Sequence, residues 1–580
     1  MNLQNQLKKA YEFAKLGNFN EAKLTLEKVL KKFPNHFDAL VNCGFIELKN
    51  NNLSKAKGYF YKALNIKLDL KILDNLSELL KHNHEWDEII DLRSKYYSTN
   101  YLFELNFAIA LRQKNYKEES LEKFKELFEA HNDNVNTYIS YGFTLNFYQL
   151  FDEAIKIYKE GLALDPDNYF LNYNLGVTYA NNEDPTNSII FLKKSISQNK
   201  ENFDAWITLA AQQIKKRMLN EALDSIQKCK EIDPNNSLII FQTAVIQMKN
   251  GDIENAKRLL KKFLEIDPEN PDGNYHLGLC MLYEQDYKHA SKYYRYRIKT
   301  KNAFGRFDDL DLPELKKDSK IIIGWEQGIG DQLLFLRLLP SFIKKYKNVT
   351  YITTDKLYDI VKSTFKEITI IKTSECEHLI QNSKNHLKIN LGSLINYENN
   401  VEYSLKLSRE LNIERQYNFL SQLSCGNKKI GLSWSSNNKS IGKDKSISLS
   451  EYQPILEVPN LDFINLQYGE VFPEIENIQN KLNIKIHFDQ SLDYFNDLTG
   501  LAALIKKCDY VITTSNVTAH FAGSLGIKTF VLVPKSHGKL WYWFSKNDKC
   551  IWYPTIKIIH QEKDGSWSQE IEEIKRLINS

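Results

Sequence analysis

A small residue recurs every 34 residues through the first half of the chain, and this period constrains the fold more than any other feature. The spacing separates Ala154, Ser188, Ala222, Ala256 and Ala290, and it also separates Ala22 from Ala56. Prolines follow the same step at Pro234 and Pro268. A unit of this length can bury its apolar side only against its neighbours. The first half is therefore predicted to be an α-helical solenoid.

The units share a small residue in the middle of the first helix, as at Gly142, Gly176 and Gly278, and sequences such as "LDPDN" and "IDPEN" after the second helix. They resemble tetratricopeptide repeats, in which small residues let two helices approach closely and proline ends each pair. We expect about nine repeats in residues 1–298. One is degenerate, near residues 71–100, because Ala56 and Ser120 are 64 residues apart, four fewer than two periods. The groove of such a solenoid is expected to hold a protein or peptide partner.

The composition argues against several classes of function. The 580 residues include 77 Lys and Arg against 73 Asp and Glu, and a net charge of +4 predicts no nucleic-acid partner. The start of the chain lacks a secretory signal, and no apolar run is long enough for an integral membrane segment, so we expect a cytoplasmic protein. Seven scattered cysteines without a C-x-x-C pair predict reduced, mostly buried thiols and no zinc site.

Beyond residue 298 the 34-residue period stops, and residues 299–317 are expected to be a linker. Short β-rich runs then alternate with helical segments. We expect strands at residues 320–325, 349–353, 368–371, 387–391, 429–434, 462–467, 484–488, 510–513 and 528–533. Strands that alternate with helices indicate parallel α/β sheets.

A hinge in residues 424–429 would divide this region into two Rossmann-like halves, residues 318–425 and 428–580. Two such halves resemble the layout of GT-B glycosyltransferases, whose site lies in the cleft between them. The predicted fold class is therefore α + α/β, with a tetratricopeptide solenoid followed by a GT-B-like pair of Rossmann-like domains.

A glycine-rich turn in the first half is the first candidate site. Gly328, Gly330 and Asp331 stand between a predicted strand and a predicted helix. Glycines allow a backbone to approach a ligand closely, and a helix start favours an anion. A dinucleotide fingerprint would need a third glycine at Leu333, although Asp355 after the next strand fits that interpretation. A plain tight turn, with Asp331 as the acid of a helix start, is the other alternative.

The second candidate site is the segment "TTSNVTAHFAG", which follows a predicted strand in the second half. Hydroxyls and free N–H groups at a helix start can bind the diphosphate of a nucleotide. His520, one turn into that helix, would add a hydrogen-bond donor. The alternative is a buried core histidine.

Several segments together resemble the glycosyltransferase family 9 group, the heptosyltransferase-like proteins, in the form fused behind tetratricopeptide repeats. They include "EQGIGDQLLFLRLLP", "KIGLSWSSNNKSIGKDKSISLSEYQPIL", "FINLQYGE" and "DLTGLAALIKKCDYVITTSNVTAHFAGSLGIKTFVLVP". The resemblance implies that Asp331 is the catalytic base and that Lys445 or Lys443 contacts the donor phosphate.

The resemblance also implies a donor-binding loop, which comprises Thr514, Ser515, Asn516, Thr518, His520 and Gly523. Two positions depart from the usual pattern of the family. Ser515-Asn516 stand where Asp-Thr is usual, and Lys445 stands where Arg is usual; lysine keeps the charge but loses the bidentate fork of arginine. No metal and no cofactor are implied, only a nucleotide-diphosphate sugar as co-substrate.

Two smaller motifs have less specific interpretations. The "DDLD" of residues 308–311 contains an Asp-x-Asp like a metal-binding pair, but it lies in the linker rather than after a strand. A cluster of aromatic residues could stack a sugar or a base, or could be core; it comprises Trp541, Tyr542, Trp543, Phe544, Trp552 and Tyr553.

Two functional hypotheses follow from these patterns. The first is an inverting, metal-independent glycosyltransferase whose repeats present a protein or glycan acceptor. The second is a non-catalytic repeat adaptor with a degenerate transferase-like domain, which the departures at Ser515 and Lys445 favour.

Overall fold

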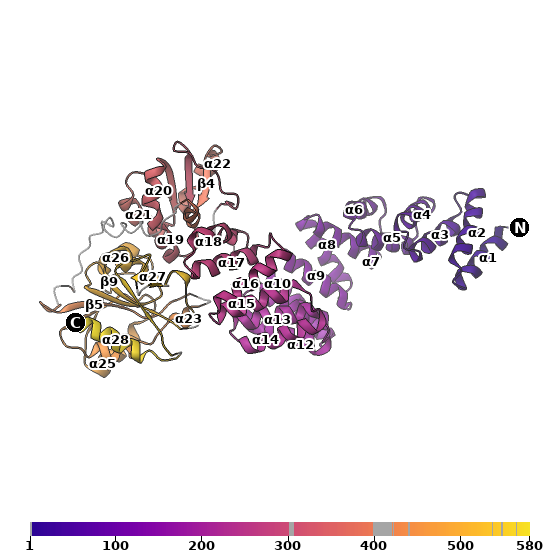
Figure 1. The fold of residues 1–580 in the computed structure, drawn as a ribbon. Coiled ribbons are helices and arrows are strands. Elements are labelled where there is room, and N and C mark those ends of the chain that lie inside the picture. The colour runs from indigo at the N-terminus through magenta and orange to yellow at the C-terminus, as the bar shows by residue number, and fades with distance from the viewer. Residues whose placement is uncertain are drawn as a thin grey trace. The chain divides into compact units, whose positions relative to one another are not determined.

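The computed structural model of the chain describes residues 3–300, 307–397, 420, 423–438, 441–535, 538–543, 545–546, 549–563 and 565–580 (Figure 1). Phe544 of the aromatic cluster lies outside these residues. The chain divides into two compact units, Met1–Asn235 and Asn236–Ser580. The first unit is all helical. The second contains the last helices of the repeat array together with both α/β regions.

The helices of the first unit follow one another in pairs. They are α1 (Leu3–Lys15), α2 (Phe19–Lys32), α3 (Phe37–Lys49), α4 (Leu53–Ile66), α5 (Leu70–His82), α6 (Trp86–Lys95), α7 (Tyr101–Gln113), α8 (Lys117–Ala130), α9 (Val135–Phe147), α10 (Phe151–Leu164), α11 (Tyr169–Asn181), α12 (Pro185–Gln198), α13 (Phe203–Lys215) and α14 (Leu219–Ile232). The helix α6, in the segment expected to be degenerate, has 10 residues, whereas α4 and α8 on either side have 14.

The residues of the 34-residue ladder are buried between the two helices of a pair. Ala22, Ala56, Ala154 and Ala222 are all buried. A Cβ atom on Gly142 would lie only 2.5 Å from the ring of Tyr158, so this position has no room for a side chain. The close approach that the sequence predicts between the paired helices is therefore confirmed.

The turn inside each pair also repeats, but in backbone conformation rather than in residue type. A residue with positive φ stands at Gly17, Asn51, His84, Asn115, Gln149, Glu183, Arg217, Gly251 and Gln285. Such a conformation usually favours glycine, yet only two of these residues are glycines. The step from Asn51 to Asn115 is 64 residues, so the four missing residues fall in the pair α5–α6 and its neighbouring turn.

The second unit begins with four more repeat helices. They are α15 (Ser237–Lys249), α16 (Ile253–Ile266), α17 (Pro271–Tyr283) and α18 (Tyr287–Tyr294), and the 3₁₀ turn η1 (Arg295–Ile298) follows. Their buried side chains belong to the same apolar core as those of both sheets. The end of the repeat array is thus packed into the α/β unit.

The first α/β region holds a four-stranded parallel sheet of order β3-β2-β1-β4. Its strands are β1 (Lys320–Gly324), β2 (Asn348–Thr353), β3 (Thr369–Lys372) and β4 (Leu387–Asn390). The helical segments between them are α19 (Ile329–Phe335), η2 (Leu336–Leu338), α20 (Leu339–Lys345), η3 (Asp355–Leu357), α21 (Tyr358–Thr364), η4 (Thr373–Glu375), α22 (Glu377–Asn382) and η5 (Leu391–Asn396).

The second α/β region holds an eight-stranded sheet of order β10-β11-β12-β9-β8-β5-β6-β7, in which only the pairs β10–β11 and β11–β12 are antiparallel. The strands are β5 (Lys428–Ser433), β6 (Leu461–Asn465), β7 (Ile486–His487), β8 (Tyr510–Thr514), β9 (Lys528–Val533), β10 (Ser545–Lys546), β11 (Lys549–Cys550) and β12 (Ile556–His560). The helical segments are α23 (Gly442–Lys445), η8 (Leu449–Tyr452), α24 (Gln453–Leu456), α25 (Phe472–Leu482), α26 (Leu498–Ile505), α27 (Val517–Ser524), η9 (Trp541–Trp543) and α28 (Ser568–Asn579).

The predicted fold class is confirmed: helical repeats precede two mainly parallel sheets with interleaved helices, which is consistent with two Rossmann-like domains. All nine predicted strands are present, and the bounds of Lys528–Val533 agree at both ends. In each sheet the direction in which successive strands are added reverses at one point. This point lies between β1 and β4 in the first sheet and between β5 and β8 in the second. In such open sheets ligands bind beyond the carboxyl ends of the strands at this point.

Six of the seven cysteines are buried, as predicted, and Cys425 is exposed. No helix in the described part of the chain is both long enough and apolar enough to cross a membrane.

Candidate functional site

Three residues that the sequence singles out converge at the reversal points of the two sheets. Asp331 follows β1 in the first turn of α19, Lys445 ends α23 after β5, and His520 lies within α27 after β8. A Cβ atom on Gly330 would lie 2.9 Å from Cδ2 and 3.1 Å from Nε2 of His520, so the imidazole edge touches the backbone beside Asp331. The two sheets therefore supply one cluster of titratable groups.

Asp331 is held at the start of its helix. Its Oδ2 accepts a hydrogen bond from the Gly328 N–H at 3.3 Å, which completes a capping box around the glycine turn, residues 327–331. Withdrawal from water raises the pKa of Asp331 to about 6, while the Gly328 N–H and the charge of Lys445 act in the opposite direction. The carboxyl group is thus mostly ionised at neutral pH and basic enough to accept a proton.

The structure separates the two candidate lysines. Lys445 is only 5% exposed, and Gly538 packs against its aliphatic stem, whereas Lys443 is exposed. Burial lowers the pKa of Lys445 to about 8, and the charge of Asp331 opposes that shift. A buried ammonium group within electrostatic range of a carboxylate can bind an anionic oxygen of a ligand.

His520 lies in an aromatic box and is only 2% exposed. The centroids of Trp543, Tyr542 and Tyr553 lie 5.0, 5.2 and 5.7 Å from that of the imidazole. Its Nδ1 is hydrogen-bonded to the Tyr553 hydroxyl at 2.9 Å. Burial, with a smaller contribution from Lys445, lowers the pKa of His520 to about 3, so the ring is neutral at physiological pH.

The hydroxyl and amide groups of the predicted donor loop mostly bond within the protein. Ser515 Oγ accepts from Trp543 Nε1 at 2.7 Å. Asn516 donates from Nδ2 to Ser433 Oγ at 2.8 Å, and its Oδ1 accepts from Thr513. These bonds shape the turn between β8 and α27, and the donor-binding role of the loop stays a prediction.

Three further members of the predicted loop have structural contacts. Thr518 Oγ1 donates to Ser433 Oγ at 3.3 Å, and Thr514 Oγ1 accepts from Asn516 at 3.4 Å. A Cβ atom on Gly523 would lie 2.5 Å from the Tyr553 ring. Gly523 therefore lets α27 pack against the strand region that carries Tyr553.

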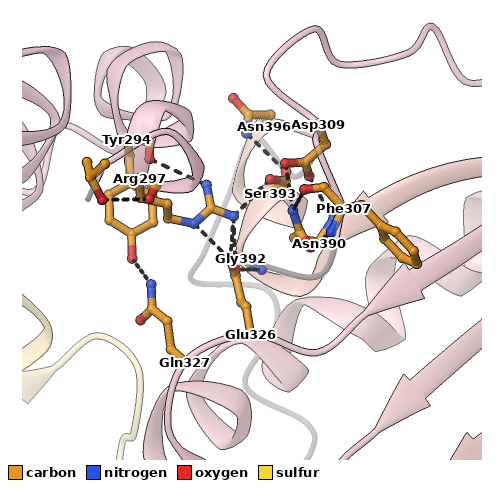
Figure 2. Close-up of polar contacts among 11 residues, drawn as sticks. Tyr294, Arg297, Phe307, Asp309, Glu326, Gln327, Asn390, Gly392, Ser393 and Asn396 are labelled. Carbon is orange, nitrogen blue, oxygen red and sulfur yellow. Dashed lines mark hydrogen bonds and ion pairs between the residues drawn. The ribbon is translucent and has the colours of Figure 1, made fainter. Parts of the chain in front are cut away.

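A buried ion pair joins the end of the repeat array to the glycine turn (Figure 2). Arg297 of η1 donates from Nε to Glu326 Oε2 and from Nη2 to Oε1, both at 2.9 Å, and both side chains are 0% exposed. Glu326 also accepts from the Gly392 N–H, and Arg297 donates to Ser393 Oγ at 3.0 Å. The bidentate geometry and these added bonds compensate for burial of the two charges.

Two tyrosines of the same repeat pair border the glycine turn. Gln327 has a left-handed backbone, φ 59°, and its Nε2 donates to the Tyr294 hydroxyl at 3.0 Å (Figure 2). Burial, together with the charge of nearby Asp331, raises the pKa of Tyr275 of α17 to about 12. The pair also reaches the other sheet, since the Tyr283 hydroxyl donates to the Lys539 carbonyl at 3.0 Å. The pair α17–α18 thus forms one wall of the candidate site.

The "DDLD" acids have structural partners. Asp309 is buried, and its carboxylate accepts from the backbone N–H and the side-chain Nδ2 of Asn390 at 2.7 and 2.8 Å (Figure 2). Asp308 pairs with Lys299. Asp355, which favoured a dinucleotide site, accepts from the Ser374 N–H at 3.2 Å. The described residues hold no group of three or more acidic, histidine or cysteine side chains placed to bind a metal.

The aromatic cluster is core in its described part. The side chains of Trp541, Tyr542, Trp543, Trp552 and Tyr553 are buried. They pack around His520 and against Phe335 of α19.

Sequence reasoning did not single out Arg297, Glu326, Gln327, Tyr275 or Tyr294. The one available signal is that Glu326 stands just after a strongly apolar strand, where an acid needs a partner.

Similarity to known proteins is clearest in the repeats. Tetratricopeptide repeat families match residues 7–69, 171–202 and 239–270. The chain therefore contains tetratricopeptide repeats, followed by a C-terminal α/β region of parallel sheets.

Two curated relatives are distant. Protein FlbA of Caulobacter vibrioides is 22% identical over 439 residues, which cover 72% of this chain and 68% of that protein. The human protein O-mannosyl-transferase TMTC3 is 22% identical over 157 residues, which cover 26% of this chain but only 17% of that protein.

Two similar solved structures each match part of the chain. YrrB, described as a tetratricopeptide-repeat protein with an unusual peptide-binding site, is 21% identical with a TM-score of 0.26, and the match covers 32% of this chain and 95% of YrrB. A tetratricopeptide-repeat protein of Parabacteroides merdae is 15% identical with a TM-score of 0.30, and it covers 48% of this chain and 98% of its own.

Proposed function

We propose that this tetratricopeptide-repeat protein is a glycosyltransferase, which moves a sugar from a nucleotide-diphosphate sugar to a protein or glycan acceptor. The observation that carries the proposal is the convergence of Asp331, Lys445 and His520. Asp331 follows a strand of the four-stranded sheet, whereas Lys445 and His520 follow two strands of the eight-stranded sheet. A structural ion pair would need only the acid and the lysine. Transfer of a group between two substrates uses a base beside the acceptor, and a cation and a neutral hydrogen-bond donor beside the leaving group.

The roles follow from the charge states. The Asp331 carboxylate takes the proton from an acceptor hydroxyl, whose oxygen forms a bond to the anomeric carbon. The bond from that carbon to the diphosphate oxygen breaks in the same displacement, so the configuration inverts and the electron pair stays with the diphosphate. The Lys445 ammonium and an N–H of His520 stabilise the negative charge that the leaving group gains. No step requires a metal.

The repeats are proposed to hold the acceptor near this site. A solenoid joined to a reaction site raises the effective concentration of whatever it binds. Since the match to a protein named as an O-mannosyl-transferase covers 17% of that protein, it supports only the association of such repeats with a transferase.

A non-catalytic adaptor is the second candidate, and one observation favours it. Ser515, which stands where the family carries an aspartate, is tied to Trp543 and brings no carboxylate to the loop. A domain with the fold but without donor binding would show this feature.

Calorimetry of the full chain with UDP, GDP, ADP, CDP and their common sugar conjugates tests the choice. We expect one nucleotide to bind, and Lys445→Gln to weaken it by roughly tenfold to a hundredfold, because a charge-assisted contact is lost. Lys443→Gln is the matched control, since Lys443 is exposed, and it should change the affinity less than about threefold. If no nucleotide binds the wild-type chain, the adaptor is the better description.

A further inference from the structure

Arg337 is a buried cation that the proposed chemistry does not use. It lies in η2, one turn beyond α19, and its side chain is 0% exposed. Within the described residues, none of its three guanidinium nitrogens has a hydrogen-bond acceptor. Burial lowers the pKa of Arg337, as expected for a charge that protein atoms shield from water. An uncompensated buried charge is costly, so its retention requires an explanation.

The guanidinium group lies on the ring of Tyr553, with 4.8 Å between its central carbon and the ring centroid. A cation over a phenol ring is attracted to the π face and withdraws electron density from the hydroxyl. Burial raises the pKa of Tyr553, and Arg337 opposes that increase. The hydroxyl therefore stays protonated and becomes a stronger hydrogen-bond donor.

The Tyr553 hydroxyl lies 2.9 Å from Nδ1 of His520, within hydrogen-bond distance. A neutral imidazole carries its proton on one nitrogen only, and the bond made by the other nitrogen fixes which one. If Tyr553 donates to Nδ1, the proton of the ring is on Nε2. The Nε2 edge is the one that contacts Gly330, and no described residue forms a hydrogen bond to it.

We propose that Tyr553 and Arg337 are positioning residues that hold His520 in the Nε2–H tautomer, so that its N–H is directed at a diphosphate oxygen beside Gly330. The identity of the ligand rests on the proposed function. The tautomer does not, because it is argued from the contacts of His520, Tyr553 and Arg337 without any ligand.

The tautomer is measured directly by nitrogen NMR of the full chain labelled at its histidine ring nitrogens. The signal of His520 is assigned as the one missing in His520→Gln, among 12 histidines. We expect Nε2 to be protonated and Nδ1 unprotonated, without change between about pH 5 and pH 8. In Tyr553→Phe the Nδ1 partner is gone, and the two tautomers should interchange.

Tyr452→Phe is the matched control. Tyr452 is also a fully buried tyrosine of the second α/β region, and its hydroxyl has no hydrogen-bond partner within the described residues. This variant should leave the His520 signals unchanged. A proton on Nδ1 in the wild type, or an unchanged tautomer in Tyr553→Phe, would overturn the proposal.

Arg337 is tested by comparing stability with binding. Arg337→Met replaces an unpaired buried charge by an apolar side chain of similar length, so the melting temperature should stay the same or rise. Affinity for the nucleoside diphosphate that binds best in the panel should nevertheless fall about threefold to tenfold. Arg337→Lys, which restores a cation, should recover part of that affinity.

The opposite pattern refutes a positioning role. If Arg337→Met lowers the melting temperature and leaves both the His520 signals and the affinity unchanged, Arg337 is only a packing residue. If the wild type binds no nucleoside diphosphate at all, the proposed function fails, and the NMR result alone decides the present inference.

Discussion

The helix pairs α9–α10 and α17–α18 have the same repeat pattern but different surroundings. Gly142 and Gly278 lie four 34-residue periods apart, and so do Tyr158 and Tyr294. Tyr158 packs against Gly142, and its hydroxyl has no hydrogen-bond partner among the described residues. The Tyr294 hydroxyl accepts from Gln327, beside the candidate base. The same repeat pattern thus forms an ordinary repeat in α9–α10 and a wall of the candidate site in α17–α18.

The difference arises where the second helix of each pair ends. The helix α10 has 14 residues and includes Gly161, where a Cβ atom would lie 2.9 Å from that of Tyr138. The helix α18 has 8 residues, and the chain continues as a 3₁₀ turn. Four periods beyond Gly161, this turn carries Arg297, which is fully buried against Glu326. A shortened helix therefore makes room for the ion pair.

The largest expected effect is on the transfer rate, when the acid in the first turn of α19 is replaced. Asp331→Asn should lower the transfer rate at least about 100-fold, because an amide cannot accept the proton. Affinity for the nucleoside diphosphate should change less than about threefold, since the proposed role of Asp331 is toward the acceptor. The readout is release of nucleoside diphosphate with the donor that binds best.

The control for Asp331→Asn is Asp152→Asn in the first turn of α10, an exposed acid. It should leave the rate unchanged. Equal loss in both variants would refute the distinction between the two regions.

The pH dependence of the rate should have two limbs. The Asp331 carboxyl, whose pKa is raised to about 6, works only when ionised, so the rate should increase as the pH rises through about 6. The Lys445 ammonium, whose pKa is lowered to about 8, works only when protonated, so the rate should fall as the pH rises through about 8. In Lys445→Arg the falling limb should disappear, because arginine stays charged. An unchanged falling limb in that variant would assign it to another group.

The next effect is on the stability of the second unit. Arg297→Met leaves the Glu326 carboxylate buried without its cation and should cost about 3–5 kcal/mol in local stability. Hydrogen exchange of residues 320–340 measures this loss in the full chain. The double variant with Glu326→Gln should recover part of it, since no charge is then left unpaired.

The ion pair of Lys23 and Glu47 in the first unit provides a control for Arg297→Met. Lys23→Met breaks the contact of Lys23 with the buried Glu47, where the lysine is partly exposed. Lys23→Met should speed hydrogen exchange only in the first unit, and by a smaller factor than Arg297→Met does at residues 320–340. A slower or unchanged exchange at residues 320–340 in Arg297→Met would count against the role of the pair α17–α18.

The smallest expected effect is on local stability, when Tyr158 or Tyr294, which occupy the same position of two repeats, loses its hydroxyl. Tyr294→Phe removes the acceptor of Gln327 and should cost about 1 kcal/mol in the local stability of the glycine turn. Tyr158→Phe removes a hydroxyl that has no partner among the described residues and should be neutral or slightly stabilising. Hydrogen exchange of residues 135–164 and 320–340 compares the two. Equal costs would mean that the two pairs do not differ in this respect.

Much of the fold follows from local patterns. The 34-residue ladder predicts helix pairs, and the short apolar runs predict nine of the strands, as at Lys528–Val533, but not β10, β11 or β12. The positive-φ turns were missed, since Asn, Gln, Glu and Arg occupy them as readily as Gly. Their position depends on packing of the paired helices rather than on residue type. The division into compact units between Asn235 and Asn236 also differs from the end of the repeat pattern near residue 298.

The sequence by itself determined the repeats and most strands of the two sheets, because periodicity and strand ends are visible in neighbouring residues. Asp331 and His520 stood out after such strand ends, and the family resemblance added Lys445 or Lys443. Only the tertiary structure decided that Lys445 is buried near enough to Asp331 to interact with its charge whereas Lys443 is exposed, and that Arg297 and Tyr294 secure the glycine turn. It likewise placed Tyr553 and Arg337 behind His520. The physical reason is that burial and the partners of a charged group come from elements far apart in the chain, and these meet only when the sheets and the last helix pair share one core.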